Sequence, residues 1–95
     1  MIRVVTAVLA VPATTNTRWQ VPKGLMWFTI QCRTAVNVLM SHLENKVAAS
    51  VDPYYTIKSG AVLSQDNIEG LDPHQDFYFS ATSAVVLEIM MGIRE

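Results

Sequence analysis

The sequence of residues 26–33, Met-Trp-Phe-Thr-Ile-Gln-Cys-Arg, places the strongest limit on the fold. Apolar side chains at positions 28, 30 and 32 alternate with polar or charged ones at 29, 31 and 33. This period of two, with aromatic and β-branched residues, is typical of a β-strand that turns one face to a core. Residues 21–24 (Val-Pro-Lys-Gly) favour a turn before it, because proline fixes φ and glycine accepts a positive φ. We therefore predict a central strand over 26–33, with the thiol of Cys32 on its buried face.

Short runs of the same kind recur along the chain, separated by residues that favour turns. We predict strands over residues 2–11, 18–21, 26–33, 36–42, 54–58, 61–64, 76–82 and 85–93. Their number and spacing predict one all-β domain over residues 1–95, a compact sandwich or jelly-roll-like domain of seven to eight short antiparallel strands. A helix is an alternative for residues 36–49, because their apolar positions also fit the period of a helix. Asn37 and Ser41 disfavour a helix interior, so we predict a strand there and a loop over 43–52.

The charge of the chain is low, with 16% charged residues, a net charge of −1 and no cluster of basic residues. We therefore expect no nucleic-acid binding. No run reaches the roughly 20 apolar residues that a membrane-spanning helix needs, so we expect no membrane partner. The apolar run before Pro12 is compatible with a secretion signal, but its removal would delete a strand, and we expect no such cleavage. A lightly charged, half-apolar domain is typical of a subunit that hides surface against copies of itself.

Residues 2–11 and 85–93 are apolar on both faces of the predicted strands, so we expect them at a subunit interface. The aromatic residues of the chain allow two interpretations, a platform for sugars or packing against a neighbouring subunit. Aromatic residues are enriched at interface cores, which favours the second interpretation. We predict eight residues at the interface, of which four are aromatic: Val5, Leu9, Trp19, Trp27, Tyr54, Tyr78, Val86 and Met90.

Two groups of residues offer candidate chemistry. On an extended chain Asp72, His74 and Asp76 share one face, and carboxylates with an imidazole can hold a divalent metal. The proline at 73 and the turn residues around it favour a plain loop instead. His42 and Glu44 can form an acid–base pair, but we expect both on an exposed loop. The single cysteine excludes a disulfide framework, and no phosphate-binding loop or nucleophile elbow occurs. We expect no catalytic activity, no cofactor and no bound metal.

Residues 18–90 also contain a series of packing and turn motifs. They are Trp19 with Val-Pro-Lys-Gly at 21–24, Phe-Thr-Ile-Gln-Cys-Arg-Thr at 28–34, Tyr-Thr-Ile-Lys-Ser-Gly-Ala-Val-Leu-Ser at 55–64, Asn-Ile at 67–68, Phe-Tyr-Phe-Ser at 77–80 and Ala-Val-Val-Leu-Glu-Ile at 84–89. In this order they resemble small all-β structural proteins of tailed bacteriophages, which coat or cement capsids or serve as small virion modules. The resemblance covers most of the chain.

The resemblance implies a capsid decoration (cement) protein, which acts as a homotrimer on the outer shell where capsomers meet and stabilises the head against the pressure of its DNA. Its partners would be copies of itself and the major capsid protein. Such a protein is made in the host cytoplasm and resides on the capsid surface of the virion. Two alternatives stay open, a carbohydrate- or receptor-binding module of a tail fibre or baseplate, and a small head–tail adaptor.

Overall fold

The computed structural model of the chain describes residues 1–66 and 75–94, and these contain eight β-strands. The strands are β1 (Ile2–Val11), β2 (Thr17–Gln20), β3 (Leu25–Cys32), β4 (Val38–Ser41), β5 (Tyr55–Ile57), β6 (Val62–Gln65), β7 (Asp76–Ser80) and β8 (Val85–Arg94). All their pairings are antiparallel, and no helix occurs in the described part of the chain. The predicted all-β class is confirmed, and the predicted strands agree closely with the observed ones.

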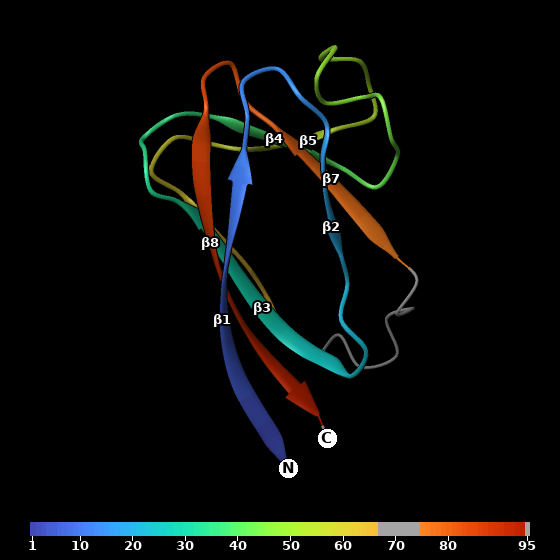
Figure 1. Cartoon of the computed structure of the whole chain (residues 1–95), viewed down its shortest axis with the longest axis vertical. Helices are drawn as coiled ribbons and strands as arrows, with labels where there is room; N and C mark the ends of the chain where they lie inside the picture. Colours follow the sequence, from blue (N-terminus) through green and yellow to red (C-terminus); the bar gives the residue numbers. More distant parts are fainter. Residues whose placement is uncertain (67–74, 95) are drawn as a thin grey trace.

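The strands pair in a nested order, like a long hairpin folded back on itself. β1 pairs with β8, β2 with β7, β3 with β6 and β4 with β5, so the loop over residues 42–54 closes the ribbon. Two more pairings, β3 with β8 and β4 with β7, roll the ribbon into sheet A (β1-β8-β3-β6) and sheet B (β2-β7-β4-β5). This arrangement of eight strands in two sheets is a jelly roll. The two chain ends lie side by side at one end of sheet A (Figure 1).

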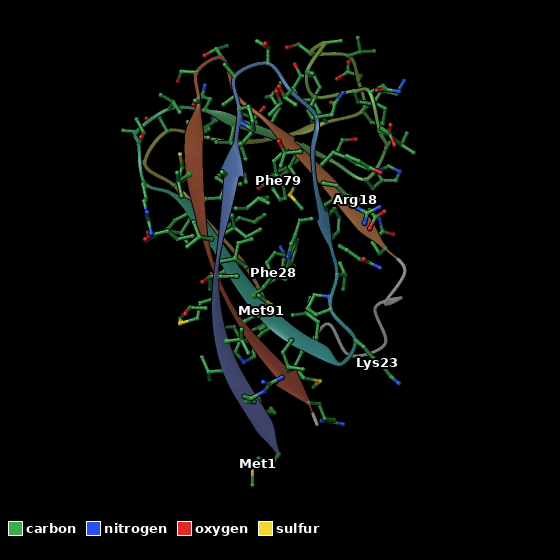
Figure 2. The ribbon with its side chains drawn as sticks, viewed as in Figure 1. Met1, Arg18, Lys23, Phe28, Phe79 and Met91 are labelled. Carbon is green, nitrogen blue, oxygen red and sulfur yellow. The ribbon has the colours of Figure 1, made fainter. Side chains whose placement is uncertain are left out.

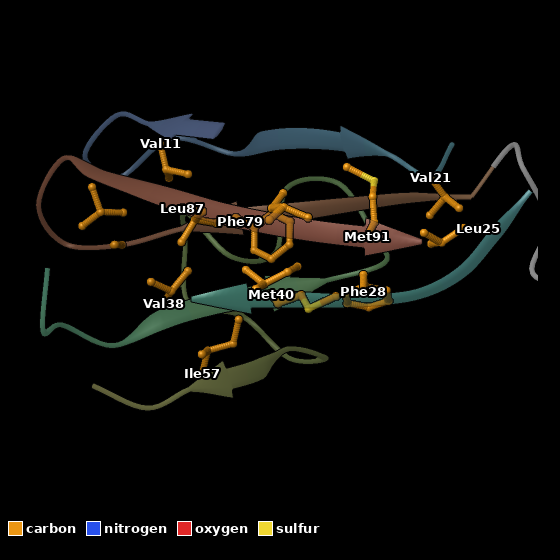
Figure 3. Close-up of a cluster of buried hydrophobic side chains, with 14 of the residues drawn as sticks. Val11, Val21, Leu25, Phe28, Val38, Met40, Ile57, Phe79, Leu87 and Met91 are labelled. Atoms are coloured by element: carbon orange, nitrogen blue, oxygen red, sulfur yellow. The ribbon is translucent and has the colours of Figure 1, made fainter. Parts of the chain in front are cut away.

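The core lies between the two sheets and consists of alternate residues of the strands. In β8, Val85, Leu87 and Ile89 are buried, whereas the residues between them turn to the other face. Phe28 of β3 and Phe79 of β7 point between the sheets (Figure 2), and Figure 3 shows the same cluster in close-up. Full burial of such a side chain contributes about 1.5–3 kcal/mol. A shift of one residue in any of these strands would expose the buried set, so the core fixes the register.

Residues 36–49 form a strand and a loop, as predicted. Val38 and Met40 of β4 are buried, and β4 pairs with β5 on one side and β7 on the other. Residues 42–54 contain turns and bends but no helix. The strand is favoured over the helix because partners on both sides satisfy its backbone while both apolar side chains reach the core.

A close backbone contact holds the turn that the sequence predicts over residues 21–24. Gly24 has a φ of +82°, and its carbonyl oxygen accepts a hydrogen bond from the N–H of Arg94 with an N···O distance of 2.8 Å. A Cβ at Gly24 would lie 2.6 Å from the carbonyl oxygen of Arg94. Gly60 also has a positive φ, +77°, but no atom lies within 4 Å of the position of its Cβ. Gly24 therefore provides both a left-handed conformation and a close approach, and Gly60 only the first.

We expect Gly24→Ala to destabilise the fold more than Gly60→Ala. Both variants incur the cost of a left-handed alanine, about 1–2 kcal/mol. Only Gly24→Ala adds a clash between the new Cβ and the backbone. Overpacked sites in protein cores indicate that such a clash costs about a further 1–3 kcal/mol. Urea unfolding of the two variants measures the difference, and equal losses of stability would contradict this account of the turn.

Candidate functional site

Exposed apolar side chains gather on the outer face of sheet A, the face turned away from sheet B. Five large ones, from three of the four strands, are between 42% and 61% exposed: Ile2, Val4, Val8, Val62 and Met90. The register places them on one face: Val8 and Val62 occupy the two edges of one row, with Glu88 and Gln31 between them, and Met90 lies in the next row between Thr6 and Thr29. The outer face of sheet A comprises Ile2, Val4, Thr6, Val8, Ala10, Trp27, Thr29, Gln31, Val62, Ser64, Val86, Glu88, Met90, Gly92 and Arg94.

The indole ring of Trp27 covers Gly92 at one end of this face. A Cβ at Gly92 would lie 2.6 Å from Cε2 and 2.8 Å from Cδ1 of the ring, so only glycine leaves room for it. Val4 is the cross-strand neighbour of Gly92 on its other side. Trp27 is therefore half-buried against its own sheet, and its ring adds apolar surface next to Val4.

A small polar network occupies the other end of the face. The Glu88 carboxylate accepts hydrogen bonds from Nε2 of Gln31 at 3.0 Å and from Nε of Arg33 at 2.9 Å. These two bonds, that from Gln31 first, hold the pKa of Glu88 below its ordinary value. The negative charge of Glu88 is thus matched by the positive charge of Arg33 on the same surface.

The outer face of sheet B differs, because residues 42–54 of the same chain cover part of it. Val47 in this loop is 1% exposed, and the N–H of Ala48 donates to Oδ1 of Asn16 at 3.0 Å. The hydroxyl of Tyr78 in β7 donates to the Glu44 carboxylate in the loop at 3.3 Å. Burial, and next the negative charge of Glu44, raises the pKa of Tyr78 above its ordinary value. Residues 42–54 therefore cover part of the outer face of sheet B.

A groove of about 400 Å³ opens between the two sheets on the side of their short edge strands. Phe28, Met40, Leu63 and Phe77 supply its apolar lining, and Ser41, His42, Tyr55 and Gln65 the polar one. Ser41 already donates to the carbonyl oxygen of Pro53 at 2.8 Å. Tyr55 is 59% exposed. An apolar pocket with a few polar groups at its rim is the usual form of a small-molecule site.

The structure brings three of the predicted interface residues together and separates the others. Trp27, Val86 and Met90 lie on the outer face of sheet A, whereas Val5 and Leu9 turn inward and pack against the core. The sequence does not distinguish the two faces of β1, because both are apolar. Ile2, Val4 and Val8 of β1 were therefore not predicted at the interface, and neither was Val62 of β6.

The aromatic residues singled out in the sequence do not form one platform. Trp19 packs inward, with its ring centroid 5.4 Å from that of Phe28 and 6.2 Å from that of Phe77. Trp27 lies on the opposite face of sheet A, and Tyr54 and Tyr78 belong to the side of sheet B. The aromatic groove residue Tyr55 was not predicted, since only the pairing of β5 with β4 turns it toward the groove.

The candidate chemical groups are not assembled into a site within the described residues. Asp72 and His74 lie outside them, and Asp76 has Oδ2 3.9 Å from Nη1 of Arg18. His42 is exposed and Glu44 contacts Tyr78. Among residues 1–66 and 75–94, no three His, Cys, Asp or Glu side chains are placed to hold a metal ion. Cys32 packs against the core cluster as a half-buried side chain.

Comparisons of the chain with protein-family models, with curated proteins and with solved structures found no match. Within the described ranges, no helix has the length and apolar character needed to span a membrane.

We expect the Glu88 network to make a small, pH-dependent contribution to stability. Because the folded-state pKa is below the ordinary value of 4.5, the contribution is present above that pH and is lost as the pH falls through the folded-state pKa. Water screens this exposed pair and keeps the effect small. Carboxyl NMR titration should show the pKa of Glu88 rising toward its ordinary value in Gln31→Ala and in Arg33→Ala. Unchanged titration in both variants would contradict the assigned cause.

Proposed function

We propose that this chain is a structural subunit of a tailed-bacteriophage particle, a capsid decoration protein that binds the outside of the head as a homo-oligomer. The observation that carries the proposal is the outer face of sheet A, on which five large apolar side chains are exposed within the described part of the chain. Apolar surface that stays in contact with water is unfavourable, so several exposed apolar side chains on one face favour an interaction site there. In a permanently assembled subunit, such a face would be buried against a neighbouring molecule.

The fold and the sequence motifs support this class of function. Jelly rolls occur in viral capsid and lectin domains, although a fold by itself does not determine function. The motif at 55–64 covers β5, the turn at Gly60 and β6, and the motif at 84–89 covers the first half of β8. These are packing and turn residues, so the resemblance to phage structural proteins concerns the scaffold. The proposed partner on the particle is the major capsid protein.

Stabilisation of the head would follow from binding linkage. A ligand that binds only the intact shell stabilises it by RT ln(1 + [L]/Kd), about 2.7 kcal/mol per site at a hundred times Kd. Many copies act on one shell, so a modest affinity per copy suffices, and linked copies bind more tightly than single ones. The homotrimer implied by the resemblance stays a prediction, which the mass of the protein in solution tests.

Expanded empty heads of the phage that encodes the chain provide the direct test. Purified protein is mixed with these heads, and co-sedimentation and the temperature of head disruption are measured as its concentration rises. We expect saturable binding to the outer surface and a disruption temperature that increases until the sites are filled. Heads that neither retain the protein nor gain thermal stability would contradict the proposed function.

The groove between the sheets favours a second candidate, a carbohydrate- or receptor-binding module of a tail fibre or baseplate. Tyr55 provides an exposed aromatic ring beside His42 and Gln65, and such rings with polar neighbours suit a sugar face and its hydroxyl groups. Calorimetric titration with host-surface oligosaccharides tests this function. Binding that Tyr55→Ala abolishes, without capsid binding, would replace the decoration function by this one.

A further inference from the structure

We infer that another copy of this chain covers the outer face of sheet A. The inference deepens the proposed function, since it identifies the surface through which decoration subunits would associate with each other. It rests on the arrangement of the face itself, and its test needs no capsid.

The charges of the face suit contact with an identical molecule. When the face meets the same face of a second copy, the contact closes a twofold dimer and not the homotrimer that the resemblance implies. Both sides then carry the same charges, so any net charge would be repelled. Glu88 and Arg33 compensate each other 2.9 Å apart. Among the described residues of the face, the further charged side chain is Arg94, which lies in the last row beside Ile2, away from the centre around Met90. Since Glu88 already accepts bonds from Gln31 and Arg33, its burial leaves no charge without a partner. The centre of the face around Met90 contains no charge, with Thr6 and Thr29 as its neighbours.

The area of the face reaches the minimum for a specific contact between two copies. A strand residue occupies about 16 Å² of a sheet, from a rise of about 3.3 Å and a strand spacing of about 4.8 Å. Strands of ten, ten, eight and four residues therefore present about 500 Å² of flat sheet. Covering this area on one copy buries a similar area on the other, about 1,000 Å² in total, which is the lower bound of specific interfaces.

Pairing through the free edge of β1 would bury less. Ten residues give an edge about 33 Å long, and a sheet is about 10 Å thick, so two edges bury about 660 Å². This value falls in the range of adventitious crystal contacts. The magnitudes therefore favour contact through the face over extension of the sheet from its edge.

The shape and content of the face support the same conclusion. Trp27 lies low over Gly92 and Met90 occupies the middle of the sheet, so the centre presents an aromatic ring and an adaptable thioether. Tryptophan and methionine are enriched in interface cores, and tryptophan is frequent among the residues that contribute most to affinity. The outer face of sheet B has a cover from residues 42–54 of its own chain, whereas within the described residues no segment covers these side chains of sheet A.

Light scattering across a concentration series, with matched lysine variants, tests the inference. Met90→Lys adds a charge at the centre of the face on an interior strand, so it affects contact through the face but not pairing at the β1 edge. Val8→Lys changes both the outer face of sheet A and the β1 edge. The control is Val51→Lys, which changes a valine of similar exposure in the loop over 42–54. We expect wild type and Val51→Lys to be oligomers, and Met90→Lys and Val8→Lys to raise the dissociation constant at least about tenfold.

Three outcomes would overturn the inference: a monomeric wild type at all concentrations, an oligomer that Met90→Lys leaves intact, or equal weakening by Val51→Lys. Thermal unfolding by circular dichroism verifies that each variant is folded, and Met90→Gln serves as a milder substitution if Met90→Lys is not.

Failure of the proposed function is distinguishable from failure of this inference. An oligomer that depends on Met90 but does not bind heads would contradict the decoration function alone. A monomer that binds and stabilises heads would contradict this inference and the homo-oligomeric state, but not head decoration.

Discussion

The pairing of β8 on both sides is the constraint on which the rest of the structure depends. This last strand lies between β1 and β3 and pairs with β1 over its whole length, from Ile2–Arg94 to Val11–Val85. Its inward residues supply a large part of the core, so the first and last segments of the chain complete sheet A together. Because these partners are distant in sequence, sheet A forms only when the two ends of the chain meet.

The nested pairing also explains why the two outer faces differ. The innermost hairpin, β4 and β5, belongs to sheet B, and its long loop over residues 42–54 folds back over that sheet. The outermost pair, β1 and β8, belongs to sheet A, and no loop of the described residues folds back over the outer face of that sheet. The face with exposed valines and Met90 is therefore a consequence of topology, and the contrast with sheet B is what makes it a candidate for contact between copies.

The fold was largely predictable from the sequence, and the candidate site only in part. Alternation in 26–33 predicts the strand directly, and the glycine at the end of 21–24 predicts the turn, because burial and φ are local consequences of residue type. The outward side of β1 was not predictable, since Ile2, Val4 and Val8 differ little from Val5 and Leu9. The groove was also not predicted, because it lies between β5 and β6, which are edge strands of different sheets and do not pair with each other.

The rate at which peroxide oxidises Met90 tests the proposed contact most directly. Met90 is 42% exposed in the isolated chain and Met1 is 97% exposed, so Met1 provides an internal reference in the same molecule. Oxidation of methionine follows its access to solvent, and mass spectrometry separates the two sites. The account predicts that concentrating the protein slows the oxidation of Met90 while that of Met1 is unchanged. An unchanged ratio of the two rates at every concentration would contradict it.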